Sequence, residues 1–324
     1  MGNTLSSLDP AIEWLLKSED PSIQFFTYVD ILGISQNSLK IKAISKKIPR
    51  GPKVRILLSG QKPDGGFGAH PYQKWTGAHW RLVSLVELGI PEDNPQARAA
   101  ANQVLTWLWG QSHRSKIRKI RGLTRRCASQ EGNALAVCCR LGMASDPRVS
   151  QLAYSLIEWE WPDGGWNCDK KPSAKHSSFY ESLAPLWGLI EYHHATGDEV
   201  CLEAAENATE LFLRHNLFRY ETRAGIIDSE WVKLHYPLYW HYDILQALRI
   251  LAPLGKLKDP RVEEALDIVE DKRKADGLWW PEGYYWWPPG TKKSNVEVVN
   301  WGRGAPNEMI TLNALRVLKL AGRI

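Results

Sequence analysis

The sequence contains no long apolar run and only a few cysteines. No stretch approaches the roughly 18–20 consecutive apolar residues of a membrane-spanning helix, and the first residues lack the basic and apolar regions of a secretory signal. The five cysteines are an odd number, which does not suit a framework of paired disulfides. We therefore expect a cytoplasmic protein with reduced thiols. Residues 1–6 also fit the pattern for N-myristoylation, which operates only in eukaryotic cells.

Linkers are absent as well. No Ser/Gly-rich stretch divides the 324 residues, so we expect a single domain over residues 1–324. Apolar residues make up 44% and charged residues 24% of the chain, as in ordinary soluble globular proteins.

An apolar triplet at positions i, i+3 and i+6 recurs along the whole chain, and each copy marks one face of a helix. The copies begin about 50–70 residues apart, which leaves room for a second helix in every period. The triplets are Phe26/Val29/Leu32, Leu82/Leu85/Leu88, Leu135/Cys138/Leu141, Leu186/Leu189/Tyr192, Leu245/Leu248/Leu251 and Leu312/Leu315/Leu318. The sequence therefore predicts an all-α fold of six helical hairpins.

The partner helices have start signals of their own, which combine a capping residue with proline at the first helical position. These starts are Asp9-Pro10, Gly51-Pro52, Asn94-Pro95, Asp146-Pro147, Asp198 and Asp259-Pro260. Long connections lead into five of the triplet helices, at residues 61–75, 111–128, 159–177, 215–236 and 275–305. We expect a single (α/α)6 toroid with these long loops on one face, where a functional site would form.

The net charge of +5 is concentrated in two segments without acidic residues, 111–128 and 40–53. Such segments are either solvated surface or sites of attraction for an anion, such as lipid head groups, a diphosphate or nucleic acid. No nucleic-acid motif accompanies the charge, so we expect no nucleic-acid partner. Contact of residues 111–128 with an anionic membrane would make the protein a peripheral membrane protein.

Three Asp-Gly turns, each followed by an aromatic residue, form a second repeat at Gln61–Phe67, Glu160–Trp166 and Arg273–Trp279. These turns resemble the QW motifs of triterpene cyclases and related turns in protein prenyltransferase β subunits. The segments Trp166–Asp169 and Lys175–Phe179, with Trp240–Asp243, resemble uncharacterised bacterial and archaeal proteins of this terpenoid cyclase/protein prenyltransferase superfamily. The resemblance implies an α/α toroid and a hydrophobic, isoprenoid substrate.

The chain departs from the family in its catalytic motifs. It lacks the Asp-x-Asp-Asp motif of class II terpene cyclases and the Asp-Cys-Thr-Ala motif of oxidosqualene cyclases. It also lacks the Asp-x-Cys zinc spacing of protein prenyltransferases, and triterpene cyclases have two such domains. A squalene-type cyclase is therefore not expected.

Polar residues lie four positions before several triplets, on the same helix face and at the end with the long loops. Helix N-termini favour glutamate, so a structural role is one interpretation. The other is a cavity whose ionisable groups transfer protons to an apolar substrate. Our candidates for this acid/base chemistry are Glu131, His241, Asp243, His176, Glu308 and Asp169.

Thiols and imidazoles in the long loops suit zinc. We expect Cys127, Cys168 and His176 as ligands, although buried cysteines are commonly packing residues and Cys168 is also a candidate nucleophile. Sixteen tryptophans supply the walls of a hydrophobic site. The candidate substrate-binding residues are Trp75, Trp80, Tyr180, Trp231, Trp240, Trp280, Tyr285 and Trp287.

Four functions fit these residues. The favoured one is an enzyme that acts on a hydrophobic, isoprenoid substrate in the central cavity. A glycosidase or lyase would use a carboxylate pair such as Glu131 and Glu308, and a zinc-dependent transferase or cyclase of peptides would use the thiols. A lipid- or partner-binding toroid without catalysis is the fourth. The fold alone does not decide among them.

Overall fold

The computed structural model describes residues 9–324 of the chain, so the myristoylation pattern at residues 1–6 lies outside the described residues. The protein is mostly helical, with 53% helix, and strand in the described part is limited to one small hairpin. No helix between residues 9 and 324 combines the length and the apolar character needed to cross a bilayer.

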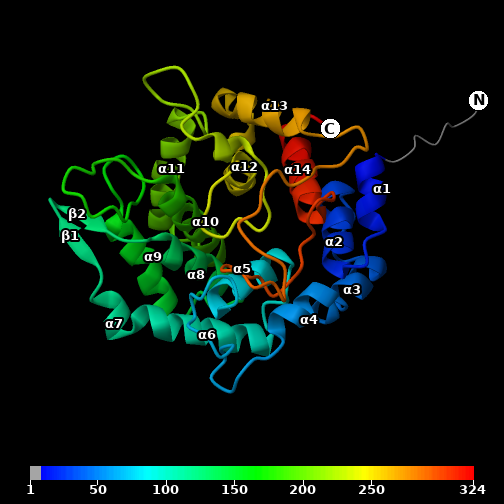
Figure 1. The fold of residues 1–324 in the computed structure, drawn as a ribbon, viewed down its shortest axis with the longest axis horizontal. Coiled ribbons are helices and arrows are strands. Elements are labelled where there is room, and N and C mark those ends of the chain that lie inside the picture. Colours follow the sequence, from blue (N-terminus) through cyan, green and yellow to red (C-terminus); the bar gives the residue numbers. More distant parts are fainter. Residues whose placement is uncertain (1–8) are drawn as a thin grey trace, which may run out of the picture.

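The helices are named here in chain order (Figure 1). They are α1 (Pro10–Leu16), α2 (Pro21–Phe26), α3 (Leu39–Ser45), α4 (Pro52–Leu58), α5 (Ala78–Glu87), α6 (Pro95–Trp109), α7 (Gln111–Arg114), α8 (Ser129–Arg140), α9 (Pro147–Trp159), α10 (Phe179–Thr196), α11 (Glu199–Arg214), α12 (Ile244–Leu251), α13 (Glu263–Asp271) and α14 (Glu308–Ala321). A π-helical turn, η1 (Thr27–Ile31), extends α2, and the hairpin pairs β1 (Arg118–Ile120) with β2 (Leu123–Arg125).

The start signals of the partner helices are confirmed. The Asp9 carboxylate accepts a hydrogen bond from the Ala11 amide, and the side chains of Asn94, Asp146 and Asp198 cap α6, α9 and α11 in the same way. Asp259 differs, because it caps a 3-10 turn over residues 260–262 and α13 begins only at Glu263.

Two basic segments contain structure that the hairpin pattern did not predict. The segment 40–53 contains most of α3, which Ser38 caps through its Oγ atom. The segment 111–128 contains α7 and the β1–β2 hairpin. None of these three elements has an apolar face long enough for the triplet pattern to detect.

The triplet helices contact one another in succession. α5 packs on α8, α8 on α10, α10 on α12 and α12 on α14, while α14 packs on α2 and η1. In Figure 1, α6, α9, α11 and α13 lie at the edge of the view and α8, α10, α12 and α14 lie nearer its middle. The α8–α10 crossing is closest at Gly132, where a Cβ atom would lie 2.2 Å from the Pro185 nitrogen, so only glycine fits.

The aromatic residues of the Asp-Gly turns serve packing. Trp166 and Trp279 are fully buried, and their indole N–H groups donate to the carbonyls of Leu156 and Val269 at 2.8 and 2.7 Å. Phe67 of the first turn lies under the Arg81 guanidinium at 4.0 Å. Each turn therefore fixes the chain just after a partner helix, α4, α9 or α13.

Glu160, in the second of these turns, makes the stability of the folded protein depend on pH. Burial and the nearby Asp163 and Glu203 raise its pKa from 4.5 to about 7. The folded state therefore binds this proton more tightly than the unfolded state, and stability falls as pH rises from about 4.5 to about 7. We expect Glu160→Gln to stabilise the fold by up to about 3 kcal/mol at pH 8 and by little at pH 4. Urea unfolding at both pH values tests this, with the exposed Glu158→Gln as control; equal effects of Glu160→Gln at both pH values would contradict it.

Candidate functional site

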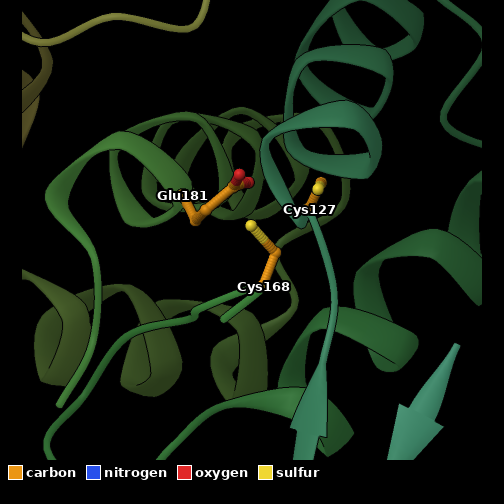
Figure 2. A group of neighbouring side chains, drawn as sticks. All are labelled: Cys127, Cys168 and Glu181. Carbon is orange, nitrogen blue, oxygen red and sulfur yellow. The ribbon is translucent and has the colours of Figure 1, made fainter. Parts of the chain in front are cut away.

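Two cysteines and a glutamate converge at one place in the structure (Figure 2). Cys127 follows strand β2, Cys168 lies in the loop between α9 and α10, and Glu181 lies in the first turn of α10. The two Sγ atoms and a carboxylate oxygen all lie within 4.8 Å of one another. We call these three residues the thiol–carboxylate group.

Main-chain contacts bring the two loops together. Arg125 and Asn167 form an isolated β-bridge, and the Arg126 amide donates to the Asn167 carbonyl at 3.1 Å. Cys127 and Cys168 are the next residues along each segment, so the bridge places their side chains beside each other. The Ser178 amide donates to the Trp166 carbonyl at 2.8 Å and fixes the entry into α10.

Hydrogen bonds and burial shift the pKa values of the three side chains in different directions. The Cys127 thiol donates to Cys168, which lowers the pKa of Cys168 and raises that of Cys127. Burial raises the pKa of Glu181. Its Oε2 atom accepts from the Ser129 amide at 3.1 Å and from the Ser129 hydroxyl at 2.8 Å, so Oε1 is the oxygen left for a ligand. Cys168 is therefore the thiol that ionises first.

The predicted zinc ligands are brought together only in part. Cys127 and Cys168 meet, although 41 positions separate them in the sequence. His176 is exposed on the loop before α10 and is not in the group, where Glu181 takes the third position. The sequence analysis missed Glu181 because the triplet register selects Ser182, its neighbour, as the polar residue of α10.

The two predicted glutamates have separate partners. Glu131 is buried and accepts from the Arg126 Nε atom at 2.9 Å and lies 3.3 Å from His113 Nε2. Glu308 accepts from Ser18 Oγ at 2.5 Å and forms an ion pair with Lys53 at 2.9 Å, beside a hollow of about 540 Å³. The structure therefore does not bring them together as a carboxylate pair.

His241 lies in a stack of aromatic rings. Its ring lies 3.8 Å from that of Trp240 and 3.4 Å from that of Tyr285, and Trp75 stacks on Tyr239 beside them. Burial lowers the pKa of His241 to about 4, so the ring is neutral at pH 7. The cavity beside it measures only about 20 Å³, whereas ligand sites commonly occupy several hundred.

The other predicted residues have mainly structural contacts. The Asp243 carboxylate caps α12 and accepts from the His235 amide, while Asp169 accepts from the Lys171 amide within its loop. Trp80 and Trp231 are buried, and Trp231 donates to the Tyr180 hydroxyl at 3.0 Å. The Trp280 indole donates to Asp276, and Trp287 is exposed. Tyr180, Trp240 and His241 thus lie around the small cavity, apart from the two glutamates.

A second group of charged side chains escaped the sequence analysis, although each follows the middle residue of a triplet by one or two positions. Arg249 pairs with Glu87 at 2.6 Å, Arg140 with Glu191 at 2.6 Å and Arg316 with Asp30 at 2.6 Å. Each triplet helix, counting η1 with α2, contributes one of these charges: Asp30, Glu87, Arg140, Glu191, Arg249 and Arg316. We call these six residues the charge belt.

Comparison with known proteins gives this chain no relatives. No family model, no curated protein and no solved structure matches it.

Proposed function

We propose that the chain is a single six-hairpin α/α toroid of the terpenoid cyclase/prenyltransferase-like superfamily. The unbroken succession of contacts from α5 to α14, and from α14 to α2, supports this arrangement. The charge belt supports it as well. Burial lowers the pKa of Arg316, the Asp30 and Glu87 carboxylates raise it, and the Arg249 guanidinium lowers it. Charges from four different helices interact in this way when the helices surround a common axis.

On this scaffold, we propose a zinc-dependent transferase or cyclase whose metal ligands are Cys127, Cys168 and Glu181. The observation that carries the proposal is the convergence of these three side chains from three separate segments. Thiolates are the protein ligands that Zn²⁺ favours, and three protein ligands with an open fourth position are typical of catalytic rather than structural zinc sites.

The surroundings fit a metal ion in charge as well as in ligand type. Two thiolates and a carboxylate carry three negative charges against two on Zn²⁺, and the nearby Arg126 guanidinium partly offsets the rise in the pKa of Cys127 that Cys168 and burial cause. Ser129 fixes the Glu181 carboxylate through Oε2, the kind of supporting hydrogen bond that orients a metal ligand. Zn²⁺ bound here would lower the pKa of a thiol or water in its fourth position. The chain itself supplies the anionic ligands, their orientation and partial exclusion of water.

Metal analysis of the purified protein tests this function. Protein prepared without chelators should contain about one zinc per chain. Metal-free protein that also fails to take up added Zn²⁺ at pH 8, where thiolates form, would contradict the proposal.

A second candidate is an enzyme acting on an isoprenoid substrate beside His241. The rings of Trp240, Tyr285, Tyr180 and Trp75 favour it, since aromatic faces stabilise carbocations. The cavity of about 20 Å³ requires these rings to move before a prenyl chain enters. The His241 Nδ1 atom lies 3.1 Å from the Leu238 carbonyl, which leaves Nε2 free as a weak base.

For this candidate, we expect His241→Ala to abolish turnover of the apolar substrate while unfolding free energy falls by no more than about 1–2 kcal/mol. The ring makes its contacts by stacking and one hydrogen bond, so its loss leaves the fold intact. Radiolabelled prenyl diphosphates and denaturant titration provide the two measurements. Unchanged turnover in the variant would remove His241 from the chemistry.

A further inference from the structure

The β1–β2 hairpin is the one two-stranded sheet in the described residues, and it carries exposed cations. Arg114, Lys116, Arg118, Lys119 and Arg121 are all exposed on it or just before it. The turn at Arg121 and Gly122 has positive φ at both residues, 50° and 81°, as in the tight two-residue hairpins that match strand twist. In Figure 1 the hairpin lies at the margin of the molecule, beside α7 and α9.

A second cationic loop lies against the hairpin. Lys170, Lys171 and Lys175 are exposed on the connection between α9 and α10. The Arg125–Asn167 bridge joins the two segments, and the Arg125 guanidinium donates to the Ala174 carbonyl at 2.9 Å. The two segments therefore form one surface, which we call the cationic face: Arg114, Lys116, Arg118, Lys119, Arg121, Lys170, Lys171 and Lys175.

The cations of this face have no acidic partners in the part of the chain that the structure describes. None of the eight forms an ion pair there, whereas Arg148, Arg261 and Arg323 elsewhere on the surface each pair with a carboxylate. The connection between α9 and α10 also carries three acids, Glu160, Asp163 and Asp169. Asp163 accepts from the Ser177 amide and hydroxyl, and the Asp169 Oδ1 atom accepts from the Lys171 amide. The eight cations are thus not held in ion pairs with these acids within the described residues.

We propose that the cationic face docks on an anionic lipid bilayer. A small anion is held by buried, converging donors, but here all eight side chains are exposed and are spread over a hairpin and a loop. A diffuse field of this kind suits the negative surface of a membrane, where each Lys or Arg contributes independently. Ile120, at the end of β1, lies among the cations and is half-buried, and Ile117 just before the strand packs against the hydrophobic core and anchors the hairpin.

The docking places the thiol–carboxylate group near the bilayer. Cys127 lies two residues after β2, and Cys168 directly follows the residue that bridges to Arg125. A site reached from this side would take its substrate from the membrane surface. Docking itself does not depend on the proposed zinc, so metal-free protein should still bind vesicles.

Co-sedimentation with vesicles tests the docking. We expect the full chain to bind phosphatidylcholine vesicles that contain phosphatidylserine, to ignore pure phosphatidylcholine, and to be released as salt rises from about 0.05 to 0.5 M. The variant Arg118→Glu/Lys119→Glu/Arg121→Glu should lose at least about tenfold in affinity. The matched control Lys42→Glu/Lys46→Glu/Lys47→Glu makes the same change in charge on exposed residues around α3. Its affinity for the vesicles should fall by less than about threefold.

Several outcomes would overturn the proposal. Wild-type protein that stays in solution with phosphatidylserine vesicles would do so, as would equal binding by the hairpin variant and its control. Binding to single-stranded RNA without binding to vesicles would assign the face to nucleic acid instead. Circular dichroism checks that the hairpin variant is folded; if it is not, Lys170→Glu/Lys171→Glu/Lys175→Glu tests the same face from the other segment.

Discussion

Replacing Cys168 with serine is expected to reduce zinc from about one per chain to nearly none, because a serine hydroxyl does not supply the thiolate that binds the metal. Cys127→Ser should have the same effect. Glu181→Gln keeps the shape of the side chain but loses its charge, and we expect it to weaken zinc affinity by about 10–100-fold. Elemental analysis after dialysis, and competition with a chromophoric chelator, measure these changes.

Cys201→Ser is the matched control for this series. Cys201 is fully buried on α11 and is absent from the thiol–carboxylate group, so its variant should keep its zinc. Zinc affinity of the wild type should also fall as pH falls, because protons compete for both thiolates. Full zinc content in Cys168→Ser, or a Cys127–Cys168 disulfide as the stable form of freshly purified protein, would contradict the site.

Removing one side of an ion pair in the charge belt should be the largest single-residue effect on stability. Arg249→Ala would leave Glu87, whose side chain is 7% exposed, without its cation. Loss of one partner of a buried pair costs about 3–5 kcal/mol, since the remaining charge stays desolvated. Among residues 9–324, only the Tyr236 hydroxyl, at 3.1 Å, would still donate to Glu87. Urea unfolding gives the free energy directly.

Arg323→Ala provides the comparison for the charge belt. Arg323 pairs with Asp267 and Glu270, which are half exposed, and such surface pairs contribute about 0–1 kcal/mol. The double variant Arg249→Leu/Glu87→Leu removes both charges and should recover most of the stability lost in Arg249→Ala. If Arg249→Ala loses no more than Arg323→Ala, the belt is not a desolvated ion-pair network and the arrangement of helices around one axis loses its main support.

The local structure of this chain was largely predictable from sequence. Capping by Asp9, Asn94 and Asp198 depends on the capping residue and its immediate neighbours, so the pattern is sufficient to place the helix starts. The buried indoles of Trp166 and Trp279 follow in the same way from the Asp-Gly turns that precede them. Periodicity of apolar residues accounts for the helices themselves.

The candidate site was predictable only in part, because it depends on how loops meet. Cys127 and Cys168 were recognisable as thiols in long loops, but their contact is made by the backbone pairing of Arg125 with Asn167, which no residue pattern signals. Glu131 was correctly placed in the first turn of its helix. Its partner Arg126, however, comes from the preceding loop, and this ion pair gives the carboxylate a structural contact that periodicity cannot reveal.

The central claim concerns the ligands of the metal, and zinc K-edge X-ray absorption measures them directly. We predict two sulfur ligands at about 2.3 Å together with oxygen ligands at about 2.0–2.2 Å. The double variant Cys127→Ser/Cys168→Ser should give almost no zinc edge, because it retains almost no zinc, and Glu181→Gln loaded with zinc should change only the oxygen shell. A zinc ion bound by nitrogen and oxygen alone in the wild-type protein would contradict the account.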